Sequence, residues 1–218
     1  MTNQKKQTME DIAIIATSFQ LPGIAHAGDL WNSISKAKIN YKQVDEDFWR
    51  RRCGDTRSYK TVAGCIEDID IFNPEYFGIL PRETINLYPQ QRLTLIGIRN
   101  LLESVGFKKR YQDTREVGVF LGASGSEYRQ RFLGKSADET LYATTGTANS
   151  IIAGRISYQY DFSGPSLVVD TACSSSLVAV ALAVASLQRK ECQFAIAGGI
   201  NLLITTRTNN EYQAMGMT

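Results

Sequence analysis

Apolar and polar residues alternate in blocks along the chain, and each block predicts one element. Short apolar runs rich in β-branched residues predict buried strands at 11–16, 117–122, 167–170, 194–197 and 200–205. Helical spacing of apolar residues predicts helices at 30–38, 148–158 and 177–188. Pro89 interrupts the helical spacing of 82–105, so we expect two helices there, the second beginning near the proline. Strands that alternate with helices indicate an α/β fold.

Three stretches depart from simple periodicity. The polar residues 1–10 are expected to be a disordered segment or linker. Residues 40–64 show no clear period and are expected to be irregular. The predicted helix 177–188 carries Leu, Val and Ala on nearly every side, so we expect it to be buried all round.

Composition narrows the class of protein. A hydrophobic fraction of 43%, a charged fraction of 21% and a net charge of +2 are ordinary for a globular chain. This charge gives no reason to expect nucleic acid or an anionic membrane as a partner. The longest apolar run, 177–187, is about half of the ~20 residues that span a bilayer, so we expect a soluble, cytoplasmic protein. Basic runs at 50–52 and 108–110 are interpreted as solvated surface, with a carrier-protein docking patch as the alternative.

Cysteine and histidine usage limits the chemistry further. The four cysteines, at 53, 65, 173 and 192, form no C-x-x-C pair and are interpreted as free thiols in a reducing compartment. The only histidine, His26, is interpreted as a surface loop residue, and a metal site built on several histidines is excluded. We expect no metal and no directly bound cofactor.

Cys173 has the strongest chemical setting in the sequence. It stands between a predicted strand and a predicted helix, within the small-residue corner Thr-Ala-Cys-Ser-Ser-Ser at 171–176. Free backbone N–H groups and the dipole at a helix start stabilise a thiolate. The same amides can stabilise the oxyanion that forms when a thiolate attacks a thioester. The alternative is a cysteine that merely packs as a small hydrophobe, and Cys65 and Cys192 fit that description.

The segment Gly-Pro-Ser-Leu-Val-Val-Asp-Thr-Ala-Cys-Ser-Ser-Ser-Leu at 164–177 resembles the active-site motif of β-ketoacyl synthases of modular polyketide synthases. Further blocks of this family follow in order at 11–15, 21–23, 68–73, 76–83, 89–92, 149–158 and 198–201. Leu87-Tyr88 stands where the family usually has Met-Asp. The resemblance implies that residues 11–218 are the amino-terminal half of a thiolase-like fold, a layered α-β-α arrangement.

The resemblance also implies an activity. In this family the active-site cysteine, here Cys173, takes an acyl chain from the phosphopantetheine arm of an acyl carrier protein, and a decarboxylating malonyl unit then attacks the thioester. The enzyme is a homodimer, and two histidines and a lysine of its carboxy-terminal half assist. These groups lie beyond Thr218 in the family pattern, so we expect this chain alone not to condense and either a separate polypeptide or an omitted segment to complete it.

Two other interpretations stay open. A thiolase on the same fold is disfavoured by the Thr-Ala-Cys-Ser-Ser-Ser string. A truncated, non-catalytic ketosynthase acting as a docking or assembly element is favoured by the missing half and disfavoured by the intact surroundings of Cys173. In either case we expect half of such a fold to leave apolar sheet and helix faces exposed.

Overall fold

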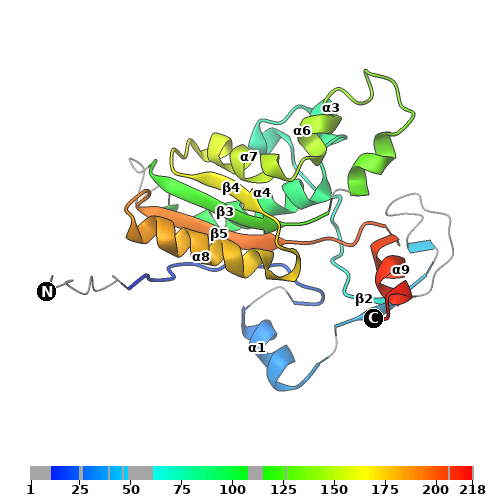
Figure 1. Cartoon of the computed structure of the whole chain (residues 1–218), viewed down its shortest axis with the longest axis horizontal. Helices are drawn as coiled ribbons and strands as arrows, with labels where there is room; N and C mark the ends of the chain where they lie inside the picture. Colours follow the sequence, from blue (N-terminus) through cyan, green and yellow to red (C-terminus); the bar gives the residue numbers. More distant parts are fainter. Residues whose placement is uncertain are drawn as a thin grey trace, which may run out of the picture. The chain divides into compact units, whose positions relative to one another are not determined.

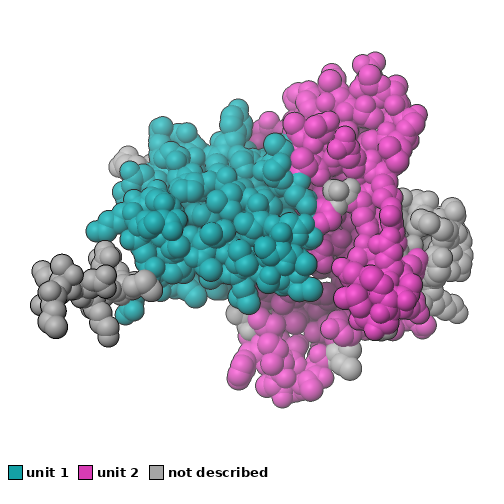
Figure 2. Space-filling view, in the orientation of Figure 1, with its two compact units in different colours: residues 1–17, 100–124, 149–200 teal, residues 18–99, 125–148, 201–218 magenta. Residues whose placement is uncertain are grey.

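The computed structural model describes residues 11–24, 27–38, 40–45, 47–48, 61–107, 115–125, 127–205 and 207–217. The chain forms two compact units (Figure 2). The first comprises residues 1–17, 100–124 and 149–200, and the second comprises 18–99, 125–148 and 201–218. The expected linker at 1–10, His26, Cys53 and the basic runs 50–52 and 108–110 lie outside the described residues.

The first unit is built on a three-stranded parallel sheet in the order β4-β3-β5 (Figure 1). The central strand β3 (Val117–Ala123) is buried at every position, as its unbroken apolar run predicts. It pairs with β4 (Ser166–Val169) on one side and β5 (Phe194–Ile200) on the other, and Gly122 lies beside both Val169 and Gly199. This arrangement confirms the predicted strands 117–122, 167–170 and 194–197.

Two helices connect the parallel strands and cover the sheet. Helix α7 (Ser150–Tyr160) directly precedes β4 at the end of the long connection from β3, and helix α8 (Ser175–Gln188) joins β4 to β5. Figure 1 shows them on opposite sides of the sheet. Ala179 and Ala183 of α8 pack against Phe120, and Ile152 and Ile156 of α7 are fully buried. Both helices confirm the sequence prediction, and the resulting layers fit one half of a thiolase-like fold.

The expectation that α8 is buried all round is wrong for this chain. Its buried residues are Ser175, Ala179, Ala183 and Ser186, which follow helical spacing along one face. On the opposite face Leu177 is 74% exposed and Val180 is 43% exposed. The sheet covers only one side of the helix, so the apolar residues of the other side remain in solvent, as expected for half a fold.

The second unit contains mainly short helices. They are α1 (Ala27–Ser35), η1 (Glu75–Phe77), α3 (Pro81–Thr84), α4 (Pro89–Ser104, whose last turn belongs to the first unit), η2 (Glu127–Phe132), α6 (Ala143–Thr147) and α9 (Arg207–Ala214). The break between α3 and α4 falls just before Pro89, as predicted. A proline fits the first turn of a helix because the N–H it lacks would have no partner there.

The Pro-Gln-Gln-Arg block at the start of α4 is buried and holds this unit together. The Gln91 side-chain amide donates hydrogen bonds to the carbonyls of Thr145, Gly146 and Ala148, at 3.1, 2.9 and 3.3 Å. The Arg92 guanidinium donates to the carbonyls of Leu87 and Thr84, at 2.9 and 3.1 Å. These polar side chains are buried because the backbone around them offers acceptors.

Tyr88, one of the departures from the family pattern, lies in an aromatic cluster of this unit. Its ring stacks on Tyr128 at 5.3 Å between centroids, and Phe132 also belongs to the cluster. The Tyr88 hydroxyl accepts a hydrogen bond from the Gln90 amide at 2.8 Å. Burial raises the pKa of Tyr88 to about 12, so the phenol stays neutral.

Three further sequence predictions are wrong. Residues 11–16 form no strand in the structure, and Ile14 is 84% exposed. The predicted strand 200–205 is not formed as a separate element: Ile200 ends β5, and the described residues 201–204 have no regular structure. Residues 40–64 are not wholly irregular, since the short strands β1 (Lys42–Val44) and β2 (Thr61–Ala63) pair antiparallel there. Among the described residues, no helix has the length and apolar character needed to cross a membrane.

Candidate functional site: the Cys173 corner

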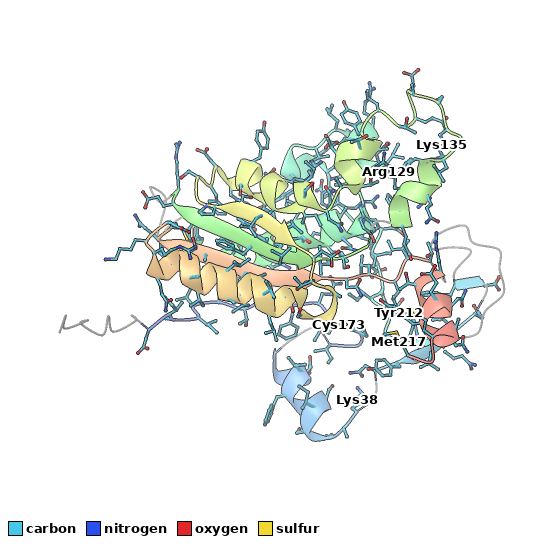
Figure 3. The ribbon with its side chains drawn as sticks, viewed as in Figure 1. Lys38, Arg129, Lys135, Cys173, Tyr212 and Met217 are labelled. Atoms are coloured by element: carbon cyan, nitrogen blue, oxygen red, sulfur yellow. The ribbon has the colours of Figure 1, made fainter. Side chains whose placement is uncertain are left out.

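Cys173 lies in the connection between β4 and α8 (Figure 3). It is the middle residue of the single-turn helix η3 (Ala172–Ser174), which runs directly into α8 at Ser175. Its side chain is exposed. The structure therefore places the thiol at a helix start, as the sequence predicted, and also in reach of solvent.

The first turn of α8 rests directly on the sheet at two glycines. A Cβ atom added to Gly122 of β3 would lie 2.6 Å from the carbonyl carbon of Ser175 and 2.6 Å from the backbone nitrogen of Ser176. A Cβ atom added to Gly199 of β5 would lie 2.7 Å from the Cβ atom of Ser176. Gly122 and Gly199 are direct neighbours in the sheet. Because these two residues have no side chain, the first turn of α8 packs directly on the backbone of the sheet. We call this pair of glycines the notch, and it sets the position of Cys173 relative to the carboxyl ends of the strands.

The backbone just before Cys173 has an unusual conformation. Ala172 has a φ of +54°, in the left-handed region that residues with a Cβ atom seldom adopt. Its N–H donates to the Asp170 carboxylate at 3.1 Å, and its carbonyl accepts from the Ser175 hydroxyl at 2.7 Å. The same Ser175 hydroxyl accepts from the N–H of Thr171 at 2.9 Å. The corner is thus held by hydrogen bonds from both sides of Ala172.

Further polar contacts tie this corner to the neighbouring strand. The Ser124 hydroxyl, just after β3, lies 2.9 Å from each carboxylate oxygen of Asp170 and donates to this group. The Ser174 hydroxyl lies 2.9 Å from the carbonyl of Thr171 and donates to it. The backbone N–H of Cys173 itself has no hydrogen-bond acceptor within the described part of the chain. A free N–H beside an exposed thiol is the arrangement that a tetrahedral oxyanion requires.

The other two cysteines that the structure describes, Cys65 and Cys192, have no comparable setting. Cys65 and Cys192 are both buried, which confirms their interpretation as packing residues. The Cys192 thiol lies 3.6 Å from the Ser186 hydroxyl at the end of α8. Sequence reasoning missed Ser124, Gly122 and Gly199, which reach the corner only through strand pairing. The one signal in the sequence is the Gly198-Gly199 pair, which stands between the predicted strands 194–197 and 200–205 and in the structure lies within β5.

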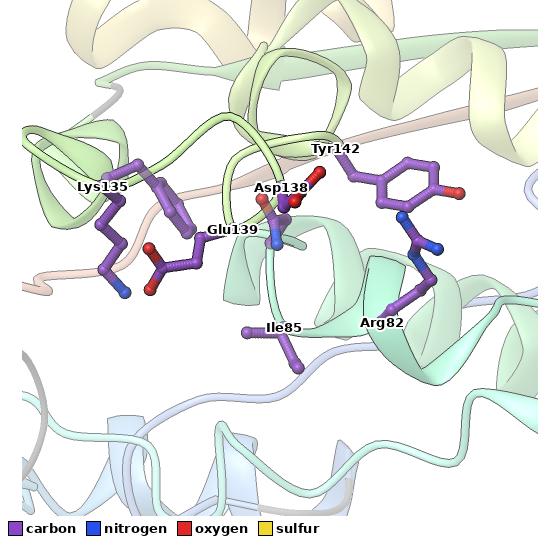
Figure 4. Close-up of a pocket in the computed structure, with 8 residues that line it drawn as sticks. Arg82, Ile85, Lys135, Asp138, Glu139 and Tyr142 are labelled. Atoms are coloured by element: carbon purple, nitrogen blue, oxygen red, sulfur yellow. The ribbon is translucent and has the colours of Figure 1, made fainter.

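A second candidate site lies in the other unit (Figure 4). A cavity of about 260 Å³ is lined by charged side chains, namely Arg82, Lys135, Asp138 and Glu139, together with Ile85, Asn86, Phe132 and Tyr142. Hydrogen bonds from the backbone N–H and the hydroxyl of Ser136 lower the pKa of Glu139 and keep it ionised. Arg82 lies over the ring of Tyr142 at 5.6 Å. Two cations and two carboxylates balance in charge, so the lining favours no single class of ligand.

The sequence and the fold both have known relatives. Residues 9–218 match the profile of the "Beta-ketoacyl synthase, N-terminal domain". The chain is 36% identical over 214 residues to a non-reducing polyketide synthase of Stachybotrys bisbyi, an alignment that covers 91% of this chain and 9% of the relative. It is 34% identical over 212 residues to the pikromycin polyketide synthase component PikAII of Streptomyces venezuelae, which covers 93% of this chain and 6% of the relative.

A solved structure supports the same assignment. The ketosynthase from module 6 of the bacillaene synthase of Bacillus subtilis 168 superposes with a TM-score of 0.77 at 28% identity. That match covers 94% of this chain and 34% of the solved one, so the chain spans about a third of the length of that ketosynthase. These similarities, together with the cysteine corner on a parallel sheet, show that the chain belongs to the β-ketoacyl synthase family and corresponds to its amino-terminal domain.

Proposed function

We propose that Cys173 is the acyl-accepting nucleophile of a polyketide-type ketosynthase. The observation that carries this proposal is the geometry of the corner: an exposed thiol at a helix start, beside a backbone N–H that has no acceptor among the described residues. A cysteine that merely packs would be buried, as Cys65 and Cys192 are.

The proposed step is a transthioesterification. The Cys173 thiolate attacks the carbonyl carbon of an acyl thioester carried on the phosphopantetheine arm of an acyl carrier protein. The carbonyl oxygen becomes an oxyanion and accepts a hydrogen bond from the free Cys173 N–H. The new bond from the Cys173 sulfur to carbon remains, the bond from carbon to the arm's sulfur breaks, and that thiolate takes up the proton lost from Cys173.

We assign the second step, condensation with a decarboxylating malonyl unit, to a complete ketosynthase rather than to this chain alone. Carbanion formation requires groups that stabilise negative charge on the malonyl carbonyl. His26 is the only histidine in the sequence. The proposal therefore includes a carboxy-terminal half, in a homodimeric enzyme, that supplies the two histidines and the lysine of the family pattern.

Acylation in vitro tests the nucleophile directly. The chain would be incubated with an acyl-pantetheine thioester, and peptide mass spectrometry would locate the added acyl group. We expect one adduct, at Cys173, that is abolished by Cys173→Ala and retained in Cys192→Ala. Folding of each variant is checked by circular dichroism. A folded wild-type chain that remains unacylated, or is acylated equally in the Cys173→Ala variant, would overturn the proposal.

A second candidate function is an assembly element without catalysis. The exposed face of α8, with Leu177 74% and Val180 43% in solvent, favours it because such apolar surface fits a protein partner. This function makes no use of the thiol. The acylation experiment therefore separates the two candidates: a ketosynthase forms an adduct at Cys173 that Cys173→Ala abolishes, whereas an assembly element forms no such adduct.

A further inference from the structure

The conformation of Ala172 requires support from its neighbours. A φ of +54° at a residue with a Cβ atom is unfavourable and persists only where surrounding contacts enforce it. Because Ala172 directly precedes Cys173, this conformation sets the direction in which both the thiol and the Cys173 N–H point. The groups that enforce it therefore act on the nucleophile without touching the substrate.

Two side chains bracket this residue. The Asp170 carboxylate accepts from the N–H of Ala172 at 3.1 Å and is itself anchored by the Ser124 hydroxyl. The Ser175 hydroxyl accepts from the N–H of Thr171 and donates to the carbonyl of Ala172 at 2.7 Å. Ser175 is 6% exposed, so water does not readily replace it. Asp170 is exposed and does not contribute to a core, which makes its role local.

We propose that Asp170 and Ser175 are positioning residues for acyl transfer: by holding Ala172 in the left-handed conformation they aim the Cys173 N–H at the developing oxyanion. This inference rests on the proposed function of Cys173. It assigns a purpose to two residues of the corner that have no part in the chemical step. Neither residue exchanges a proton or forms a bond with the acyl group.

The proposal separates two reactions of the same thiol. Transfer of an acyl group forms an oxyanion, which needs a donor at a defined position. Alkylation by iodoacetamide is a direct displacement at carbon and forms no such oxyanion. Loosening the corner should therefore slow acylation by about 10- to 100-fold, the range of a misplaced catalytic group, and leave the alkylation rate nearly unchanged.

The experiment compares both rates at Cys173 in chains carrying Ser175→Ala or Asp170→Ala, each of which removes the side-chain partner of the backbone around Ala172. The matched control is Ser166→Ala, which removes a hydroxyl that bonds Ser157 at 3.0 Å outside the corner. We expect the ratio of the acylation rate to the alkylation rate to fall in both variants and to stay constant in the control. Adding Ala172→Gly to Ser175→Ala should partly restore acylation, because glycine adopts a positive φ without support.

The outcomes distinguish the inference from the proposed function. A wild-type chain that is alkylated but never acylated refutes the proposed function and this inference together. Acylation of the wild type with an unchanged ratio in both variants refutes the positioning role alone. Asp170→Ala alters only an exposed side chain and removes the acceptor of the Ala172 N–H, so its ratio remains decisive if Ser175→Ala proves unstable. A loss in Ser175→Ala that the added Ala172→Gly does not relieve would also count against the positioning role.

Discussion

Gly122→Ala offers a sharp test of how the nucleophile is placed. The added Cβ atom would lie 2.6 Å from two backbone atoms of the first turn of α8, about 0.8 Å short of the ordinary contact distance of 3.4 Å. Backbone atoms cannot rotate away as a side chain can, so either α8 lifts from the sheet or β3 bends. Overpacking of this kind costs about 1–3 kcal/mol.

An opposing effect reduces this cost. Replacing glycine by alanine lowers the entropy of the unfolded chain and stabilises the fold by about 0.4–1 kcal/mol where the site accepts a Cβ atom. Gly154 in the middle of α7 is such a site, because an added Cβ atom meets nothing within 4 Å. Gly154→Ala is therefore the matched control. We expect Gly122→Ala to lower the free energy of unfolding by about 1–2 kcal/mol and Gly154→Ala to raise it by about 0.5–1 kcal/mol.

Urea denaturation followed by circular dichroism measures both changes. With slopes of about 1–3 kcal/mol per molar urea, the two midpoints should move in opposite directions. Gly122→Ala should also slow acylation of Cys173, because the lifted helix start carries the thiol with it. A Gly122→Ala chain as stable as the wild type, with unchanged acylation, would show that the notch does not set the position of the corner.

Three further outcomes follow from the structure. Gln91→Ala should lower the free energy of unfolding, measured in urea, by about 2–3 kcal/mol, because three carbonyls lose the amide that donates to them. The control Gln130→Ala alters an exposed side chain and should change this free energy by less than about 0.5 kcal/mol. Tyr88, with a pKa of about 12 against 10.0 in the unfolded chain, binds its proton more tightly when folded. Stability should therefore be lost as pH rises from about 10 to 12, by on the order of 2–3 kcal/mol, and Tyr88→Phe should remove that loss in urea titrations at each pH. Because the Leu177 side chain is 74% exposed, Leu177→Lys should change the free energy of unfolding by less than about 0.5 kcal/mol. It should also reduce self-association of the chain, measured by light scattering, because it removes exposed apolar surface. A clear loss of stability would contradict the exposure of this side chain.

Local patterns predicted the elements whose formation depends on local forces. The unbroken apolar run of β3 and the proline before α4 are each determined within a few residues, and both were predicted correctly. The run at 11–16 has equally strong strand character, but a strand also needs an edge to pair with, and the sequence does not encode which edge is available. Its isoleucines are therefore exposed despite the pattern.

The candidate site, too, has features that the sequence could predict and features that it could not. The position of Cys173 at a helix start could be predicted from its small neighbours and the apolar helix that follows. The left-handed Ala172 could not, because alanine rarely adopts that conformation and only the surrounding hydrogen bonds impose it. The notch formed by Gly122 and Gly199 requires the register of two strands that are far apart in sequence.

The strand order of the sheet also determines when this corner can form during folding. The central strand β3 pairs with β4, which precedes Cys173, and with β5, which follows it. The notch that contacts α8 is therefore incomplete until β5 pairs with β3 and Gly199 lies beside Gly122. Pairings between distant segments form slowly because loop closure must come first. The thiol of a nascent chain is thus synthesised after β3 and β4 but before β5, and its orientation as a nucleophile waits until β5 has paired with β3.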